Sequence, residues 1–220
     1  MGSASYEMGR GLDSLEDHRP SLGFSGPYTK AMWGPDYPVR TARLALRPWR
    51  IEDQEVYIAI RTDPEVARHI PGHPLTRDKS IEWFAQAGSE IKKAGQALSL
   101  AIERLEDATI VGTAGLYWRD DVHRQAEIGF ILLPPFFGQG FATEASAALL
   151  ELAFVGLGAH RVFATLDASN RASEKVCQRL GMRREGLHVG AYVNGDTWVD
   201  SLTYALVEDE WRKSLATPSR

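Results

Sequence analysis

The chain has 220 residues, about one and a half times a typical domain length, which predicts one domain with an extension. Hydrophobic residues make up 44% and charged residues 25%, as in globular proteins, so wholesale disorder and fibrous architectures are excluded. The formal charge is -4, so the chain lacks the basic excess that direct binding to a nucleic-acid backbone requires.

The composition also bears on compartment and partners. A single cysteine cannot form an internal disulfide, and no apolar run approaches the about 20 residues that span a bilayer. The first residues lack the apolar segment of a secretory signal, and the spacing of cysteine and histidine predicts no metal site. We therefore expect a soluble, cytoplasmic protein without a metal or a membrane partner, either a monomer or a homodimer.

Glycine and proline are concentrated near the N-terminus, where residues 1–39 contain six Gly and four Pro. Such a composition is typical of loops and extensions rather than of a packed core. We therefore predict an extension at 1–39, a domain at 40–212 and a short tail at 213–220.

The hydrophobic pattern of the domain predicts a mixed α+β fold. In chain order, the first half should contain a strand at 43–47, helices at 52–61, 64–69 and 78–93, and a hairpin of strands at 97–104 and 109–118. The second half should contain a strand at 127–133, a helix at 143–154, a strand at 161–166, a helix at 171–180, and a last hairpin at 187–193 and 197–206 around Asn194-Gly195. One sheet flanked by helices is the simplest arrangement of these elements.

The most informative segment is residues 134–143, which we call the glycine loop. Gly138-Gln139-Gly140 stands directly before a predicted helix, and glycines allow a ligand to approach the backbone closely. Amide groups at a helix N-terminus are unpaired and carry a partial positive charge, so they suit a pyrophosphate. Taken alone, the motif is equally typical of a tight turn, and it matches neither the P-loop nor the dinucleotide-binding pattern.

Five motifs in order resemble the GNAT superfamily of acetyl-CoA-dependent N-acetyltransferases, especially its RimJ/RimL branch, which is named for N-terminal acetylation of ribosomal proteins. The motifs are Thr41 to Trp49, Glu127 to Phe130, Phe137 to Ala145, Asn170 to Met182 and Asn194 to Trp211. The resemblance covers about residues 40–212. It implies a twisted mixed sheet of about seven strands, flanked by helices, that splays open between its fourth and fifth strands.

The resemblance also implies that acetyl-CoA binds in the splay as co-substrate. The residues expected to hold it lie on the fourth strand, in the glycine loop and at the start of a later helix: Phe130, Ile131, Leu132, Leu133, Gly138, Gln139, Gly140, Phe141, Ala142, Thr143, Asn170 and Ser173. The chain departs from the superfamily at two positions. Phe137 replaces a polar residue of the loop, and Cys177 stands where many relatives carry a tyrosine that acts as general acid.

Acetyl transfer from a thioester needs a neutral amine, a polarised carbonyl and a proton for the leaving thiolate. Glu127 is the candidate base, although its place on the strand equally suits an ion pair with an arginine. Ser173 is the candidate hydrogen-bond donor to the CoA sulfur, unless it only caps its helix. The candidate residues for the acceptor pocket, each also typical of an ordinary structural position, are Trp49, His69, Trp118 and Tyr192.

The predicted function is direct transfer of an acetyl group to a primary amine, with a protein N-terminal α-amino group as the favoured acceptor. The pKa of an α-amino group is about 7.7–8.0 against about 10.4 for lysine, so it needs less help from a base. Three alternatives stay open. They are a small-molecule amine such as an antibiotic or a polyamine, a CoA-binding module without turnover, and a peptide-binding partner that acts through residues 1–39.

Overall fold

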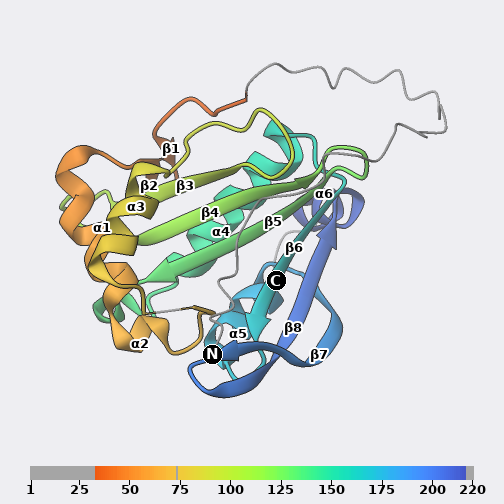
Figure 1. Ribbon diagram of the computed structural model, residues 1–220. Coiled ribbons are helices and arrows are strands. Elements are labelled where there is room, and N and C mark those ends of the chain that lie inside the picture. Colours follow the sequence, from red (N-terminus) through yellow and green to blue (C-terminus); the bar gives the residue numbers. More distant parts are fainter. Residues whose placement is uncertain (1–32, 73, 217–220) are drawn as a thin grey trace, which may run out of the picture. The chain divides into compact units, whose positions relative to one another are not determined.

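One sheet frames the fold, and its eight strands follow the order β1-β2-β3-β4-β5-β6-β8-β7. The computed structural model describes residues 33–72 and 74–216 (Figure 1). The strands are β1 (Val39–Arg40), β2 (Leu44–Pro48), β3 (Ala97–Arg104), β4 (Ile110–Asp120), β5 (Gln125–Leu132), β6 (Arg161–Asp167), β7 (Arg183–Asn194) and β8 (Thr197–Val207). The strand beyond the seven expected is β1, which pairs with β2. Residues 1–32 of the expected extension and 217–220 of the expected tail lie outside the described residues.

Helices flank the sheet, as a mixed α/β fold requires. They are α1 (Gln54–Thr62), α2 (Pro64–Ala67), α3 (Arg77–Ala85), α4 (Phe141–Glu151), α5 (Arg171–Arg179) and α6 (Glu208–Ala216). In the part of the chain that the structure describes, none of them has the length and apolar composition of a membrane span.

The two faces of the sheet contact different sets of side chains, because side chains alternate between the faces along each strand. On one face, apolar side chains of β2 to β5 pack with those of α4 and α5 in the main core. The opposite face is covered by α1 to α3 (Figure 1). There Arg47 of β2 is buried, and its guanidinium lies 2.6 Å from both Asp53 and Glu103. This ion-pair network ties the start of α1 to the sheet.

The sheet opens between β5 and β6, its one parallel pair of neighbours among the described strands. The two strands pair only from Gln125 to Glu127, where Glu127 faces Phe163. On its other edge β5 stays paired with β4 up to Leu132, and β6 stays paired with β8 up to Asp167. The strands therefore diverge toward their C-terminal ends (Figure 1), which confirms the predicted splay between the fourth and fifth expected strands.

Two segments differ from the expectation. The helix predicted at 78–93 ends at Ala85, and Ile91 instead pairs with Trp33 in an isolated β-bridge. Beyond the helix, the chain at Gly88 lies against β3, where the Ser99 amide donates to the Gly88 carbonyl oxygen at 2.7 Å and a Cβ atom at Gly88 would lie 2.7 Å from the Ala97 carbonyl oxygen. At the other end, Trp211 belongs to α6 rather than to the last hairpin, and its ring stacks on Phe154 at 5.1 Å.

Candidate active site

The glycine loop lies at the open end of the splay, between the end of β5 and the first turn of α4. Gly138 and Gly140 have φ angles of 74° and 83°, a left-handed conformation that favours glycine. Gly140 immediately precedes α4, so the first amide groups of that helix have no partners within it. A Cβ atom at Gly138 would meet no atom within 4 Å, which shows that open space adjoins this backbone.

A polar side chain in the same turn lacks a partner. Among the described residues, the hydroxyl of Thr143 is buried and makes no hydrogen bond. The Gln139 side chain donates to the Pro135 carbonyl oxygen at 3.0 Å, which fixes the shape of the loop from within. Unpaired amides, an unpaired hydroxyl and an open approach together fit an anionic group such as the pyrophosphate of CoA.

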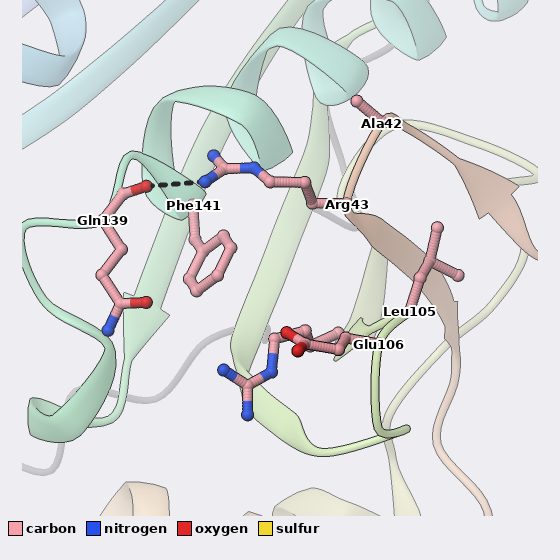
Figure 2. Close-up of a pocket in the computed structure, with 7 residues that line it drawn as sticks. Ala42, Arg43, Leu105, Glu106, Gln139 and Phe141 are labelled. Carbon is pink, nitrogen blue, oxygen red and sulfur yellow. Dashed lines mark hydrogen bonds between the residues drawn. The ribbon is translucent and has the colours of Figure 1, made fainter.

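Arg43 and Glu144 join the start of β2 to the first turn of α4. The Arg43 guanidinium contacts Glu144 at 2.6 Å, donates to the Gln139 carbonyl oxygen at 3.0 Å and lies over the Phe141 ring at 4.6 Å. Burial raises the pKa of Glu144, but hydrogen bonds from Thr41 and Arg43 outweigh it, so the pKa is lowered. Figure 2 shows Arg43 reaching across Phe141 toward Gln139, at the wall of an open hollow of about 480 Å³.

Helix α5 begins just after β6 and places two predicted site residues at the splay. The Asn170 side-chain oxygen accepts a hydrogen bond from the Ser173 amide at 3.0 Å, so Asn170 caps the helix. The hydroxyl of Ser173 therefore does not serve as the cap, and this residue is half-buried. One turn further, Cys177 is buried in the core, and burial raises the pKa of its thiol to about 12.

Glu127 stands where β5 and β6 stop pairing, and its carboxylate is engaged by an arginine. Arg119 contacts one oxygen of Glu127 through Nε at 2.8 Å and through Nη2 at 2.5 Å. The guanidinium also lies over the Tyr117 ring at 4.9 Å. Of the two possibilities raised by the sequence, the ion pair is therefore present in the structure.

The structure separates the four residues predicted for the acceptor pocket. Trp118 is 7% exposed and packs in the main core, because strand alternation turns it toward α4. Its indole N–H donates to Asp121. Trp49 packs edge-on against Tyr57 at 5.0 Å, and its indole nitrogen is buried without a hydrogen-bond partner among the described residues. Neither tryptophan borders the hollow at Arg43 or the one at His69 and Asp167.

His69 and Tyr192, in contrast, meet at Asp167, the last residue of β6. His69 Nδ1 lies 3.2 Å from Asp167 Oδ2. The Tyr192 hydroxyl is buried near Asp167, and burial together with that charge raises its pKa to about 12. The turn that carries His69 is fixed to β7, because Asn194 donates to the Arg68 carbonyl oxygen at 3.0 Å.

His69 and Asp167 border a second open hollow of about 540 Å³, which we call the acceptor-side hollow. Its lining comes from the turn after α2, the end of β6 and the β7–β8 hairpin: Arg68, His69, Asp167, Ala168, Ser169, Asn194, Trp198, Val199 and Asp200. Sequence reasoning missed Asp167 and Ser169. Their position between the end of a strand and the helix cap Asn170 was the available signal.

Residues 43–183 match the acetyltransferase (GNAT) domain family. The chain belongs to the GNAT acetyltransferase family. The matched stretch contains the splay, the glycine loop and the start of α5, so these features are those of an acetyl-CoA-dependent N-acetyltransferase. Within the described residues, no group of three or more His, Cys, Asp or Glu side chains is placed to hold a metal ion.

Two relatives match most of the chain. The uncharacterized N-acetyltransferase YnaD of Bacillus subtilis is 29% identical over 173 residues, which are 79% of this chain and 98% of YnaD. The structure of Mycobacterium smegmatis RimJ in complex with CoA-disulfide aligns with a TM-score of 0.67 at 25% identity, over 81% of this chain and 88% of that one. These similarities support the RimJ/RimL-like branch.

Other relatives carry names that state an acceptor. The putative ribosomal N-acetyltransferase YdaF of B. subtilis is 36% identical over 108 residues, 49% of this chain and 58% of YdaF. The spermidine N(1)-acetyltransferase of Escherichia coli is 24% identical over 115 residues, 52% of this chain and 61% of that protein. Both classes of acceptor thus occur among the relatives of this chain.

Proposed function

We propose that this N-acetyltransferase transfers the acetyl group of acetyl-CoA directly to the α-amino group at a protein N-terminus. The observation that carries the proposal is the acceptor-side hollow, which opens to the surface beside the splay. A chain end can enter such a hollow amino group first while the rest of the polypeptide stays outside. Trp198, which is 68% exposed at its rim, offers an apolar surface to the following residues.

The residues that would hold acetyl-CoA lie along one path. Backbone groups of Phe130 to Leu133 would pair with the pantetheine amides on the edge of β5 that β6 leaves. The amides of Gly138 to Thr143, with the Thr143 hydroxyl, would bind the pyrophosphate. The side-chain NH2 group of Asn170 would bond the pantetheine arm, since its oxygen already caps α5. When bound, acetyl-CoA supplies the thioester that the amine attacks.

In this proposal, one side chain would assist the leaving thiolate and another would set the electrostatic environment. The Ser173 hydroxyl would donate to the CoA sulfur as the thiolate leaves, in the place of the missing tyrosine. Cys177 is unsuited to that role because it is buried in the core. Glu127 would help to set the electrostatic environment at the closed end of the splay, together with Arg119.

Small polyamines are the second candidate acceptors. Asp167 and Asp200 both border the acceptor-side hollow, and carboxylates attract a polycation. The spermidine-acetylating relative supports this candidate, whereas the relative named for ribosomal acetylation supports the first. Both carboxylates also accept internal hydrogen bonds, Asp200 from the Gly190 amide at 2.8 Å and Asp167 from Ser169, which hold them in place beside the hollow.

Mass spectrometry after incubation with isotope-labelled acetyl-CoA tests the proposal. The acceptors are a peptide library with free N-termini, the same library with blocked N-termini, and a mixture of spermidine, spermine and aminoglycosides. We expect label on free α-amino groups of the first library. Label on polyamines or aminoglycosides alone would overturn the N-terminal assignment, and binding of acetyl-CoA without any labelled product would indicate a module without turnover.

A further inference from the structure

The Asp167 carboxylate is held in a fixed orientation at the open end of the splay. Its side chain is 4% exposed. Oδ1 accepts hydrogen bonds from the Ser169 amide at 2.7 Å and from the Ser169 hydroxyl at 2.6 Å. The other oxygen, Oδ2, lies 3.2 Å from His69 Nδ1. Burial raises the pKa of Asp167, but the bonds from Ser169 and His69 outweigh it and lower the pKa, so the carboxylate is ionised at neutral pH.

The hydrogen bonds determine which nitrogen of His69 carries its proton. A serine hydroxyl has one proton to donate, and the 2.6 Å contact directs that of Ser169 to Asp167 Oδ1. Although Ser169 Oγ also lies 3.4 Å from His69 Nδ1, it therefore has no second proton for the ring. An ionised carboxylate can only accept, so Nδ1 must be the donor to Asp167. In the neutral ring, Nε2 is then unprotonated and can accept a proton.

The position of the ring suits contact with an acceptor amine. His69 lines the acceptor-side hollow, and its side chain is 27% exposed. The charged and titratable groups that face it are Arg68 of the same turn, Asp167 at the end of β6 and Asp200 on β8, with Tyr192 of β7 beside Asp167. A histidine that faces a hollow and is held by a carboxylate suits the role of a general base.

Glu127 offers a less suitable proton acceptor. Arg119 contacts its carboxylate through two nitrogens, so an incoming ammonium group would compete with a guanidinium already in place. His69 has the opposite environment, since its closest charged partner is the carboxylate of Asp167. That carboxylate holds the ring in the tautomer whose Nε2 can accept a proton.

We propose that His69 is the general base that deprotonates the acceptor amine, and that Asp167 is the residue that positions it. The inference rests on the amine acetylation proposed above. The acceptor enters as an ammonium group and passes one proton to Nε2 of His69, which releases it to solvent through the open hollow. The nitrogen lone pair then forms the bond to the thioester carbon. The C–S bond breaks with its electron pair on sulfur, and the second proton lost by nitrogen ends on that sulfur.

The same contacts argue against an acyl-serine intermediate on Ser169. In a serine–histidine–aspartate relay, the serine and the aspartate contact different nitrogens of the ring. Here Ser169 and Asp167 both face Nδ1, and the serine proton points to the carboxylate. Ser169 therefore supports Asp167 and takes no acetyl group.

Nitrogen-15 NMR of ring-labelled histidine tests the assignment without any acceptor. In the full-length protein with CoA bound, at a pH where the ring is neutral, we expect Nδ1 of His69 to be protonated and Nε2 unprotonated. His69→Gln identifies the resonance. Asp167→Asn should reverse the tautomer because its amide donates to Nδ1, whereas Ser169→Ala should keep it. A ring protonated on Nε2 in the wild type would overturn the proposal.

Kinetics tests the same claim with whichever amine the mass spectrometry identifies. We expect His69→Gln to lower kcat/KM by about 10²- to 10³-fold, to remove the acidic limb of its pH profile, and to leave the affinity for CoA unchanged. Imidazole should partly restore the rate of His69→Ala. Asp167→Asn should lower kcat/KM by about tenfold or more and shift the acidic limb of the pH profile. The control is His123→Gln on the exposed β4–β5 turn, which should change neither kcat/KM nor the pH profile.

The two proposals fail in different ways. If polyamines are acetylated and peptides are not, the N-terminal assignment fails, but the tautomer and the effect of His69→Gln still decide the role of His69. If peptides are acetylated and His69→Gln keeps the wild-type rate and pH profile, the assignment of the base is overturned while the proposed function stands. A His69 ring protonated on Nε2 overturns the assignment of the base even where no acceptor is found.

Discussion

Arg119 and Glu127 form an ion pair across β4 and β5, at the residue where β5 ceases to pair with β6. Tyr117, which faces Glu127 directly in the strand register, lies beneath the guanidinium. The Glu127 carboxylate, at the closed end of the splay, is thus paired with a cation of the protein itself. In our proposal, this ion pair makes Glu127 a part of the electrostatic environment, and His69 accepts the proton.

Glu127→Gln should therefore lower kcat/KM by less than about tenfold. The glutamine amide has the same shape as the carboxylate, and only the partly exposed ion pair with Arg119 is lost. Initial rates of CoA thiol release measure the effect, with Glu151→Gln at the exposed end of α4 as control. A loss of 10²-fold or more, with loss of the acidic limb of the pH profile, would identify Glu127 as the base.

Alanine substitutions at Gly140 of the glycine loop and at Gly95, a control glycine outside it, should separate the effect of backbone strain from that of ligand contact. Gly95 and Gly140 have similar φ angles of 87° and 83°, so alanine at either position should cost about 1–2 kcal/mol of folding free energy. Only Gly140→Ala, whose Cβ atom would lie 3.3 Å from the Arg43 guanidinium, should also weaken CoA binding. Calorimetry of CoA binding and urea unfolding measure the two effects. Equal CoA affinity in both variants would refute the pyrophosphate site.

Ser173→Ala should reduce kcat by about tenfold to a hundredfold while the dissociation constant of CoA changes little, since a hydrogen bond to the departing thiolate exists only as the bond breaks. Pre-steady-state rates and CoA calorimetry measure the two quantities. Ser214→Ala removes a hydroxyl from α6 and serves as control. Wild-type turnover in Ser173→Ala would remove this residue from the mechanism.

Glu144→Gln should destabilise the fold by about 1–2 kcal/mol at neutral pH, because hydrogen bonds from Thr41 and Arg43 would meet a neutral amide. The pKa of Glu144 is lowered in the folded state, so its contribution is present above about pH 4.3, the ordinary value, and is lost as the pH falls through the folded value. Urea unfolding across this range should show the two proteins converging in acid. A difference independent of pH would contradict the ion-pair explanation.

Much of the fold follows from local patterns in the sequence. The glycine loop and the helix at 171–180 were both predicted, because glycine conformation and helix periodicity are local properties. The partners of side chains were less accessible. The pairing of Glu127 with Arg119 depends on the register of β4 and β5, and Trp118 was placed in the acceptor pocket although alternation turns it toward α4.

The acceptor side was the least predictable part of the site. His69 and Asp167 are 98 residues apart in the chain, and only the return of the α2 turn to the end of β6 brings them together. His69 was a candidate without a partner, and Asp167 was overlooked. Long-range contacts of this kind leave no periodic signal in one sequence.

The most direct test of the proposed acceptor is a comparison of kcat/KM for two forms of one peptide that contains a single internal lysine. One form has a free N-terminus, and the other has an acetylated N-terminus. We predict rapid acetylation of the first form at its α-amino group and no measurable turnover of the second. Equal rates for the two forms, with the label on lysine, would contradict the assignment of the protein N-terminus as the substrate.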